Sequence, residues 1–229
     1  MEGYKLTYNV DMVFCIDSTA SMADIIETAP RKIMDIYHDV KESREKQGGH
    51  VDTFRVRIIA YRNYLVDAAD AMLVTKFFTL PQEANDLKRC VSSLTGKGGG
   101  DGPKDGLEAL AYAIRSRWNN EPYSKNRHII VLWTDNDTHD LGYGKYSNHY
   151  PKGMAADFQE LTAWWGNQDE SGYMSQSAKR LILLAPDSPG WRKVSDSWDA
   201  VVQYPSEAGR GMKDFEYRCL INVMICMDL

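Results

Sequence analysis

An apolar run near the N-terminus ends in three oxygen-bearing side chains at alternate positions. Residues 10–16 are almost entirely apolar, and Asp17, Thr19 and Ser21 follow at once. A short run of this kind is typical of a buried strand. Alternation on a tight turn can direct one carboxylate and two hydroxyls to one point beyond the strand end. Such hard oxygen ligands suit Mg²⁺, Mn²⁺ or Ca²⁺ and not soft metals.

The composition predicts one folded domain over residues 1–229. Hydrophobic residues make up 43% of the chain, and no linker, repeat or low-complexity segment divides it. The net charge of −5, without a basic stripe, argues against a nucleic-acid partner. Asn9 and Asp11 interrupt any signal-peptide core, and no apolar run reaches transmembrane length, so we expect a cytoplasmic protein without membrane contact. Four cysteines without a CxxC pair are expected to be reduced and buried: Cys15, Cys90, Cys219 and Cys226.

The first half of the chain alternates between strand and helix patterns. Helical spacing from Ile26 to Val40 predicts a helix that Pro30 kinks or restarts. Strands are expected over residues 54–61 and 73–78, and only about ten residues separate them, so this pair should be antiparallel. A helix is expected over residues 82–94, and Pro103 should open the next one.

The second half continues the alternation. Residues 128–133 form a continuous apolar run, which is typical of a central parallel strand. A long loop to about residue 152 precedes a helix over residues 154–165, and short strands follow near residues 181–184 and 200–202. Residues 211–227 suggest a helix, or else a strand. The pattern predicts a doubly wound α/β fold: a mostly parallel central sheet with one antiparallel edge strand and helices on both faces.

Three distant segments carry oxygen ligands to the same edge of this sheet. In open α/β sheets, ligands bind beyond the carboxyl ends of the strands. Asp17 ends the first strand, and Asp135 follows the central strand. A glycine-rich segment, residues 96–102, brings Asp101 to the start of a helix. Their convergence is more specific than any one of the motifs.

These segments together resemble the metal-ion-dependent adhesion site of von Willebrand factor A (vWA) domains. The family motif D-x-S-x-S is matched by Asp17, Thr19 and Ser21, with threonine in place of the first serine, and Asp135 matches the aspartate after the fourth strand.

The glycine-rich segment resembles a variant of that family. Residues 98–103 look like the GGGDxP form, in which an aspartate, here Asp101, replaces a threonine. Lys104 departs from the glutamate that usually follows, and residues 61–64 resemble the YRDY of these relatives. Because no signal peptide is recognised, the chain looks like an intracellular member of the bacterial type.

The resemblance implies a protein-interaction module and not an enzyme. A protein partner of unknown identity would supply an acidic side chain to a bound Mg²⁺, or to Mn²⁺ or Ca²⁺. The implied metal ligands are Asp17, Thr19, Ser21, Asp101 and Asp135. The sequence leaves three roles open for Asp101: a direct ligand, a ligand through water, or the N-cap of the following helix.

Two other functions remain open. One is a Mg²⁺-dependent hydrolase or phosphotransferase with Asp17 as nucleophile, although Thr19 stands where the haloacid-dehalogenase pattern needs a second aspartate. The other is a structural domain with a vestigial site, in which residues 17–21 only cap a helix. The glycine segment matches neither a P-loop nor a dinucleotide fingerprint. Residues 135–146 fail the EF-hand pattern at the required glycine and glutamate.

The loop over residues 136–152 is the expected specificity element, because long loops on rigid scaffolds commonly carry function. We expect Asn63, Gly99, Asn136 and the loop through Tyr150 to ring the open side of the metal site. Within that loop, three polar residues are expected to be solvated and not ligands: Asp137, His139 and Asp140.

Overall fold

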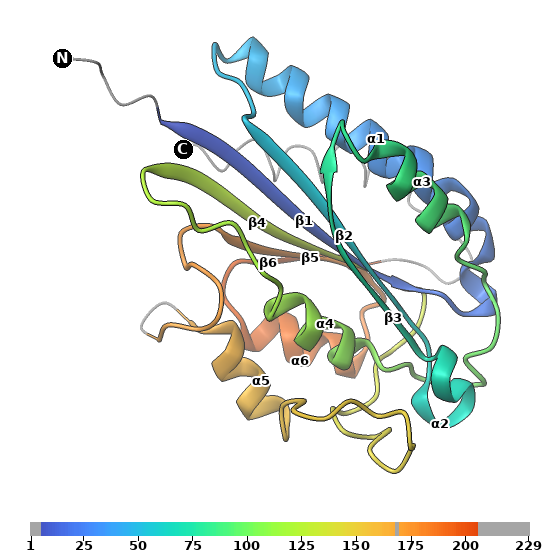
Figure 1. The fold of residues 1–229 in the computed structure, drawn as a ribbon. Coiled ribbons are helices and arrows are strands. Elements are labelled where there is room, and N and C mark those ends of the chain that lie inside the picture. Colours follow the sequence, from blue (N-terminus) through green and yellow to red (C-terminus); the bar gives the residue numbers. More distant parts are fainter. Residues whose placement is uncertain (1–5, 168–169, 206–229) are drawn as a thin grey trace.

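A six-stranded sheet forms the centre of the protein, as seen in a computed structural model that describes residues 6–167 and 170–205 (Figure 1). The strand order is β3-β2-β1-β4-β5-β6, and only β2 and β3 pair antiparallel. The strands are β1 (Thr7–Asp17), β2 (Thr53–Tyr61), β3 (Met72–Leu80), β4 (Ser124–Trp133), β5 (Lys179–Ala185) and β6 (Val201–Pro205).

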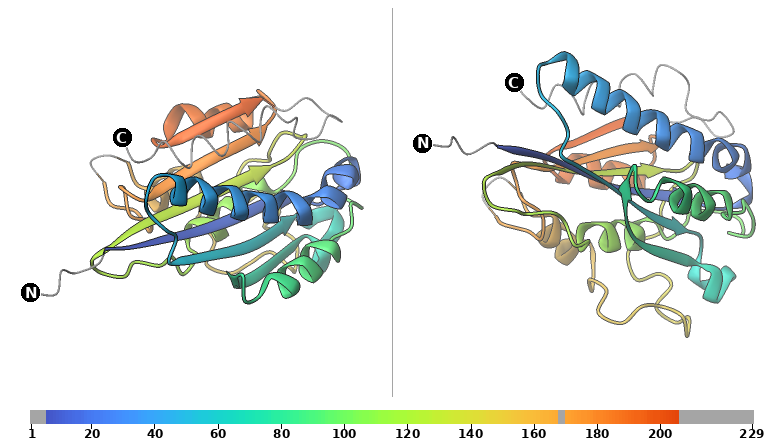
Figure 2. Two further views of the ribbon diagram at one scale, coloured as in Figure 1. Left: turned by 90° about the horizontal axis from the view of Figure 1, so that it is seen from above. Right: turned by 45° about the horizontal axis from the view of Figure 1, so that its top comes forward.

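Helices cover both faces of the sheet, with α1 and α3 on one side and α4, α5 and α6 on the other (Figures 1 and 2). Two short 3₁₀ turns, η1 (Ala20–Met22) and η2 (Ala68–Asp70), lie beside the strand ends. The helices are α1 (Ala23–Lys46), α2 (Tyr64–Asp67), α3 (Ala84–Ser92), α4 (Gly106–Ile114), α5 (Phe158–Trp165) and α6 (Pro189–Ser197). The predicted fold class, with its antiparallel edge strand, is confirmed.

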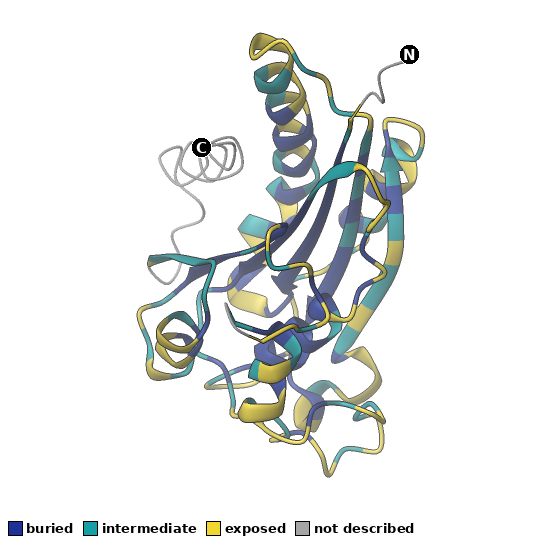
Figure 3. Ribbon diagram, turned by 90° about the vertical axis from the view of Figure 1, so that its left-hand side faces the viewer, coloured by how far each residue is buried: buried dark blue, intermediate teal, exposed yellow. Residues whose placement is uncertain are grey.

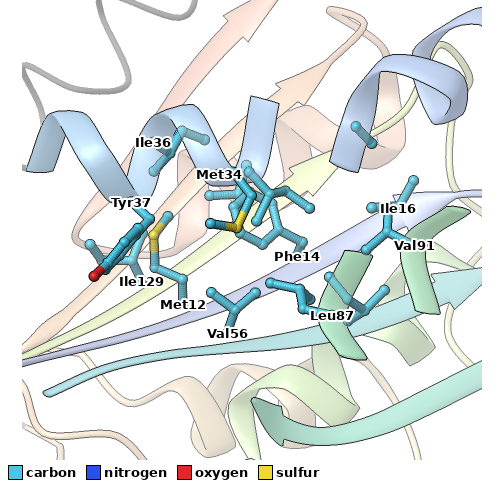
Figure 4. Packing of buried hydrophobic residues seen from close by; sticks show 14 of the residues in the cluster. Met12, Phe14, Ile16, Met34, Ile36, Tyr37, Val56, Leu87, Val91 and Ile129 are labelled. Carbon is cyan, nitrogen blue, oxygen red and sulfur yellow. The ribbon is translucent and has the colours of Figure 1, made fainter. Parts of the chain in front are cut away.

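Strand β1 is buried along almost its whole length because it is central and covered twice (Figure 3). Its alternate side chains divide between two cores. Met12, Phe14 and Ile16 pack with α1 and α3 (Figure 4), while Val13 and Cys15 pack toward α4. This double burial explains why the strand reads as a continuous apolar run and not as an alternating one.

Several details differ from the sequence expectations. Helix α1 continues unbroken past Pro30, so the proline does not restart it. Helix α4 begins at Gly106 and not at Pro103, because Lys104 instead pairs in a short parallel bridge with Thr138. Helix α6 was not predicted; its short sequence turns only Trp191 and Val194 inward, too weak a periodic signal.

Cys15 is buried and Cys90 half-buried, both free thiols, and burial raises the pKa of each. Cys219, Cys226 and the expected element at residues 211–227 lie outside the described residues. Among the described helices, none combines the length and the apolarity needed to cross a bilayer.

The central strands should carry most of the stability. Leu132→Ala in β4 removes a fully buried side chain between helices and sheet, and should lower the free energy of unfolding by about 2–5 kcal/mol. Leu73→Ala on edge strand β3, where the leucine is largely exposed, should cost far less. Urea denaturation of both variants measures the difference, and equal losses would contradict the assignment of β4 to the core.

Candidate metal centre

Asp17 ends β1 with a buried carboxylate that two neighbouring segments hold in place. One oxygen accepts a hydrogen bond from the backbone N–H of Thr19, at 3.0 Å. The other accepts from the hydroxyl of Thr134, at 2.7 Å, just beyond β4. The carboxylate is thus fixed between the ends of two adjacent parallel strands.

Ser21 and Asp135 join the same cluster from the solvent side. The Ser21 hydroxyl, on η1, donates to an Asp135 carboxylate oxygen at 3.0 Å. The hydroxyls of Thr19 and Ser21 lie 3.4 Å apart. Thr19 is buried, Asp135 is half-buried and Ser21 is exposed. Four of the five residues predicted from the sequence therefore come together, with Thr134 as an addition that sequence reasoning did not select.

The two carboxylates of this cluster are held by hydrogen bonds and by no ion pair within residues 6–167 and 170–205. Burial raises the pKa of Asp17, the hydrogen bonds from Thr19 and Thr134 lower it, and the charge of Asp135 raises it again. Neither Asp17 nor Asp135 forms an ion pair with any described residue. In the described part of the chain, no three carboxylate, imidazole or thiol side chains gather to hold a metal ion.

The glycine segment lies against the cluster through its backbone. Gly99 has φ +87°, and a β-carbon there would lie only 2.3 Å from the Thr19 methyl group. Its N–H donates to both carboxylate oxygens of Asp67, at 3.0 and 3.1 Å. The close approach explains the need for glycine at this position.

Asp101 itself lies exposed on this segment and forms no hydrogen bond with the described residues of the cluster. The structure does not make it the N-cap of α4, because Asp105 occupies that position. The helix-cap interpretation is therefore wrong, whereas the roles as direct or water-mediated ligand stay predictions.

Lys104 explains how the segment is held. The side chain is buried, and its ammonium group donates to the carbonyl oxygens of Gly100, at 2.8 Å, and Gly102, at 2.5 Å. The residue that departs from the family pattern thus closes the glycine segment into a compact loop.

Arg62 connects the surrounding loops. Its buried guanidinium donates to three backbone carbonyls: those of Ser18, Asp70 and Thr95, at 2.8–2.9 Å. These residues follow β1, α2 and α3, respectively. The arginine lies within the motif at residues 61–64, but nothing in a single sequence shows that it would bind carbonyls and not a ligand.

A second polar cluster anchors the long loop that follows β4. Glu108 of α4 is fully buried, and one of its carboxylate oxygens accepts from Gly142 N–H, at 2.9 Å, and from the Tyr150 hydroxyl, at 3.0 Å. The other oxygen is buried and has no hydrogen-bond partner among the described residues. Burial, then the charge of Asp105, raises the pKa of Glu108 to about 7.

Two polar residues of this loop are only partly exposed, and each has partners in the protein. The His139 ring contacts the buried Asp105 carboxylate at 2.9 Å and stacks on Tyr143. Asp137 accepts from the Ser188 hydroxyl and from Gly190 N–H at the start of α6. Asp140 is exposed, as expected, and pairs with Lys193.

The expected rim also needs correction. Asn63 is buried and its side chain accepts from Leu65 N–H as the N-cap of α2, while the Tyr150 hydroxyl points to Glu108. Large apolar and aromatic side chains stand exposed on α2 and on the long loop, among exposed polar ones such as Asp140 and Lys145: they are Leu65, Val66, Tyr143 and Tyr146.

Comparison with solved structures finds likeness in fold. The pilus adhesin SpaC of Lactobacillus rhamnosus GG superposes with a TM-score of 0.53 at 10% identity, over 97% of this chain and 31% of the adhesin. Its open conformation gives 0.51 at 11% identity, over 97% and 30%. A von Willebrand factor type A protein from Catenulispora acidiphila gives 0.53 at 16% identity, over 95% and 43%.

The chain thus spans less than half the length of each of these structures. No protein-family model and no curated protein matches the sequence. The protein has a vWA-like α/β fold, and this fold is what the comparisons establish.

Glu108 should make stability depend on pH. Because its pKa is higher in the folded chain than the ordinary value of 4.5, the folded state binds the proton more tightly, and stability falls as the pH rises from about 4.5 to 7. Glu108→Gln cannot ionise. Relative to this variant, the wild type should lose up to about 3 kcal/mol between pH 5 and pH 8 in urea titrations.

Tyr150→Phe serves as a companion variant. Removing the hydroxyl that donates to Glu108 takes away a stabilising partner of the charged form, so the same loss of stability should move to higher pH. A pH dependence identical in the wild type and Glu108→Gln would rule out Glu108 as its source.

Proposed function

We propose that this protein is a metal-dependent protein-interaction module and not an enzyme. The observation that carries the proposal is the convergence of Asp17, Thr19, Ser21 and Asp135 through hydrogen bonds of about 3 Å at the carboxyl end of the sheet. The vWA-like fold of an adhesin and of a vWA protein supports the same class of function. The cytoplasmic location expected from the sequence stays a prediction.

The donor set fits a hard divalent cation. Carboxylate and hydroxyl oxygens are the ligands that Mg²⁺ and Mn²⁺ prefer. Asp17 and Asp135 bring two carboxyl groups into a partly buried place where no described cationic side chain pairs with either. An ion bound there would relieve the cost of burying Asp17 and would replace the Ser21–Asp135 hydrogen bond by shared coordination.

The site can leave one side for a partner. Asp17 and Thr19 are buried, whereas Ser21 is exposed. The protein would therefore supply ligands from its interior, and the opposite side of the metal site would face solvent. Two carboxylates, with neutral hydroxyls, would leave the ion more able to attract an outside carboxylate than three would. An aspartate or glutamate of the partner is the group that would complete the coordination.

The surface beside the site suits a protein partner. Leu65 and Val66 on α2 are exposed, and Val66 contacts the glycine segment. Tyr143 and Tyr146 stand exposed on the long loop, which Gly144 packs against Tyr64 of α2. Aromatic and aliphatic side chains of this kind supply contact area around a charged centre.

The hydrolase alternative receives less support. A reaction at Asp17 would need an acid or base placed for proton transfer. His139 is engaged by Asp105, and the ammonium group of Lys104 by two carbonyls. The domain with a vestigial site predicts no metal binding, so metal titration separates it from the proposed module.

Metal binding should depend on both carboxylates. Calorimetric titration with Mg²⁺ or Mn²⁺ should show one site in the wild type, and Asp17→Asn and Asp135→Asn should each weaken it at least tenfold, because each removes a charged ligand. Asp196→Asn on the exposed face of α6 is the matched control and should bind as the wild type does. Unchanged affinity in both site variants would remove the basis for the proposal.

Partner binding should follow the metal. An immobilised wild-type protein should retain an identifiable partner in Mg²⁺ and lose it in EDTA, and Asp17→Asn should fail to retain it in either buffer. Circular dichroism should be the same in all four conditions, because the sheet core does not involve the site. A complex that survives EDTA would show that another surface binds the partner.

Asp101 should contribute less than the two carboxylates of the cluster. It is exposed and makes no contact with them, so we propose that it acts through water. Asp101→Asn should therefore weaken Mg²⁺ binding by only a fewfold in the same titration, against the larger loss expected for Asp135→Asn. An equal loss in these two variants would instead make Asp101 a direct ligand.

A further inference from the structure

A pocket of about 300 Å³ lies away from the metal site, between α4, strand β2 and the end of the long loop. Three basic side chains line it, Arg57, Arg115 and Lys152, and no acidic side chain does. Its other walls include Tyr112, Met154 and Trp164. A basic pocket is unexpected in a chain whose net charge is −5.

Arg57 has an uncompensated charge in a place that would otherwise be apolar. It belongs to the same face of β2 as Ile59 and lies opposite Val13 of β1. Its guanidinium donates to the Thr75 carbonyl and the Ser116 hydroxyl, both at 2.8 Å, and pairs with no carboxylate of the described residues. Burial lowers its pKa, which is the sign of a charge short of compensation.

The charge of Arg55, two residues earlier on the same strand, is neutralised by an ion pair. Its guanidinium donates to both carboxylate oxygens of Asp11, at 2.7 and 2.5 Å, across the β1–β2 pair. The residue opposite Arg57 on β1 is Val13, whose aliphatic side chain can neither neutralise the charge nor accept a hydrogen bond. The register of β2 also shifts against β3 between Arg57 and Ile59, a bulge of the kind that redirects side chains.

The other lining groups add charge and flat apolar surface. Arg115 lies over the Trp164 ring, 4.9 Å from its centre, and donates to the Gly153 carbonyl at 2.8 Å. This contact fixes the guanidinium beside the pocket without neutralising it. Lys152 is exposed on the loop and has no ion pair among the described residues.

We infer that this pocket binds a small organic anion, a phosphate or carboxylate attached to a flat apolar group. The anionic end would meet Arg57, Arg115 and Lys152, and the apolar part would lie against Tyr112, Met154 and Trp164. Guanidinium groups suit both kinds of oxyanion, and the volume matches that of small-ligand pockets. The inference is independent of the metal site.

The inference is tested by nuclear magnetic resonance titration in EDTA, which removes any metal–phosphate contact. The three probes share one benzene ring and differ in the attached group: phenyl phosphate, benzoate and benzyl alcohol. We expect saturable binding of at least one of the two anions, which identifies the preferred oxyanion, with shifts at the pocket and at least tenfold weaker binding of the neutral alcohol. Binding of neither anion, or equal binding of the alcohol, would overturn the inference.

Variants locate the site. Arg57→Met and Arg115→Met should weaken binding of the preferred anion at least fivefold, and Lys152→Ala, on the exposed loop where folding is not at risk, at least twofold. Arg117→Met, an exposed arginine two residues beyond Arg115, is the matched control and should bind as the wild type does. Asp17→Asn should also bind normally, which keeps this test separate from that of the metal site. Equal binding by Lys152→Ala, Arg115→Met and the control would refute the assignment.

Discussion

The loops at the carboxyl end of the sheet depend on one buried guanidinium. Arg62 pairs with no carboxylate in the described part of the chain, and its guanidinium donates to carbonyls of three separate loops. The Ser18 carbonyl also accepts from the backbone N–H of Lys97, at 3.2 Å, so the guanidinium and this backbone contact together join the segment after β1 to the glycine segment. One side chain therefore sets the distances among the segment that carries Thr19, the helix α2 and the glycine segment.

Lys104 and Arg62 play parallel roles, since both satisfy backbone carbonyls with a buried cation. Lys104 lies close to the cluster, since a β-carbon on Gly99 would meet both its Cε, at 3.1 Å, and the Thr19 Cβ, at 2.8 Å. Among the described residues, neither cation pairs with Asp17 or Asp135, because their donors are taken up by carbonyls. The cations therefore hold backbone segments, while hydroxyl and amide groups hold the two carboxylates.

The fold could be predicted because long apolar runs and the lengths of the connections between them determine it. The apolar run of β4 and the short connection between β2 and β3 each had one structural interpretation, and both are confirmed. Helix α6 and the start of α4 were missed, because a few residues and a local bridge at Lys104 decide them. Of the site, the residues next to strand ends could be found from topology alone. The partners of Glu108, Asp137 and His139 could not, since they join positions more than thirty residues apart without any local signal.

The close packing of the glycine segment restricts how this surface could diversify. Gly98 and Gly99 both have positive φ, and added side chains would collide with Asp67 and Thr19. New binding preferences therefore cannot arise there by substitution. The long loop after β4 is fixed to the scaffold through Glu108 and Asp105, while side chains such as Tyr146 and Lys145 stand exposed on it. In relatives or designed variants of this protein, we therefore expect substitutions on the long loop and not at the packed glycines. Steric constraint keeps the glycine side of the surface constant, while the loop side is open to selection.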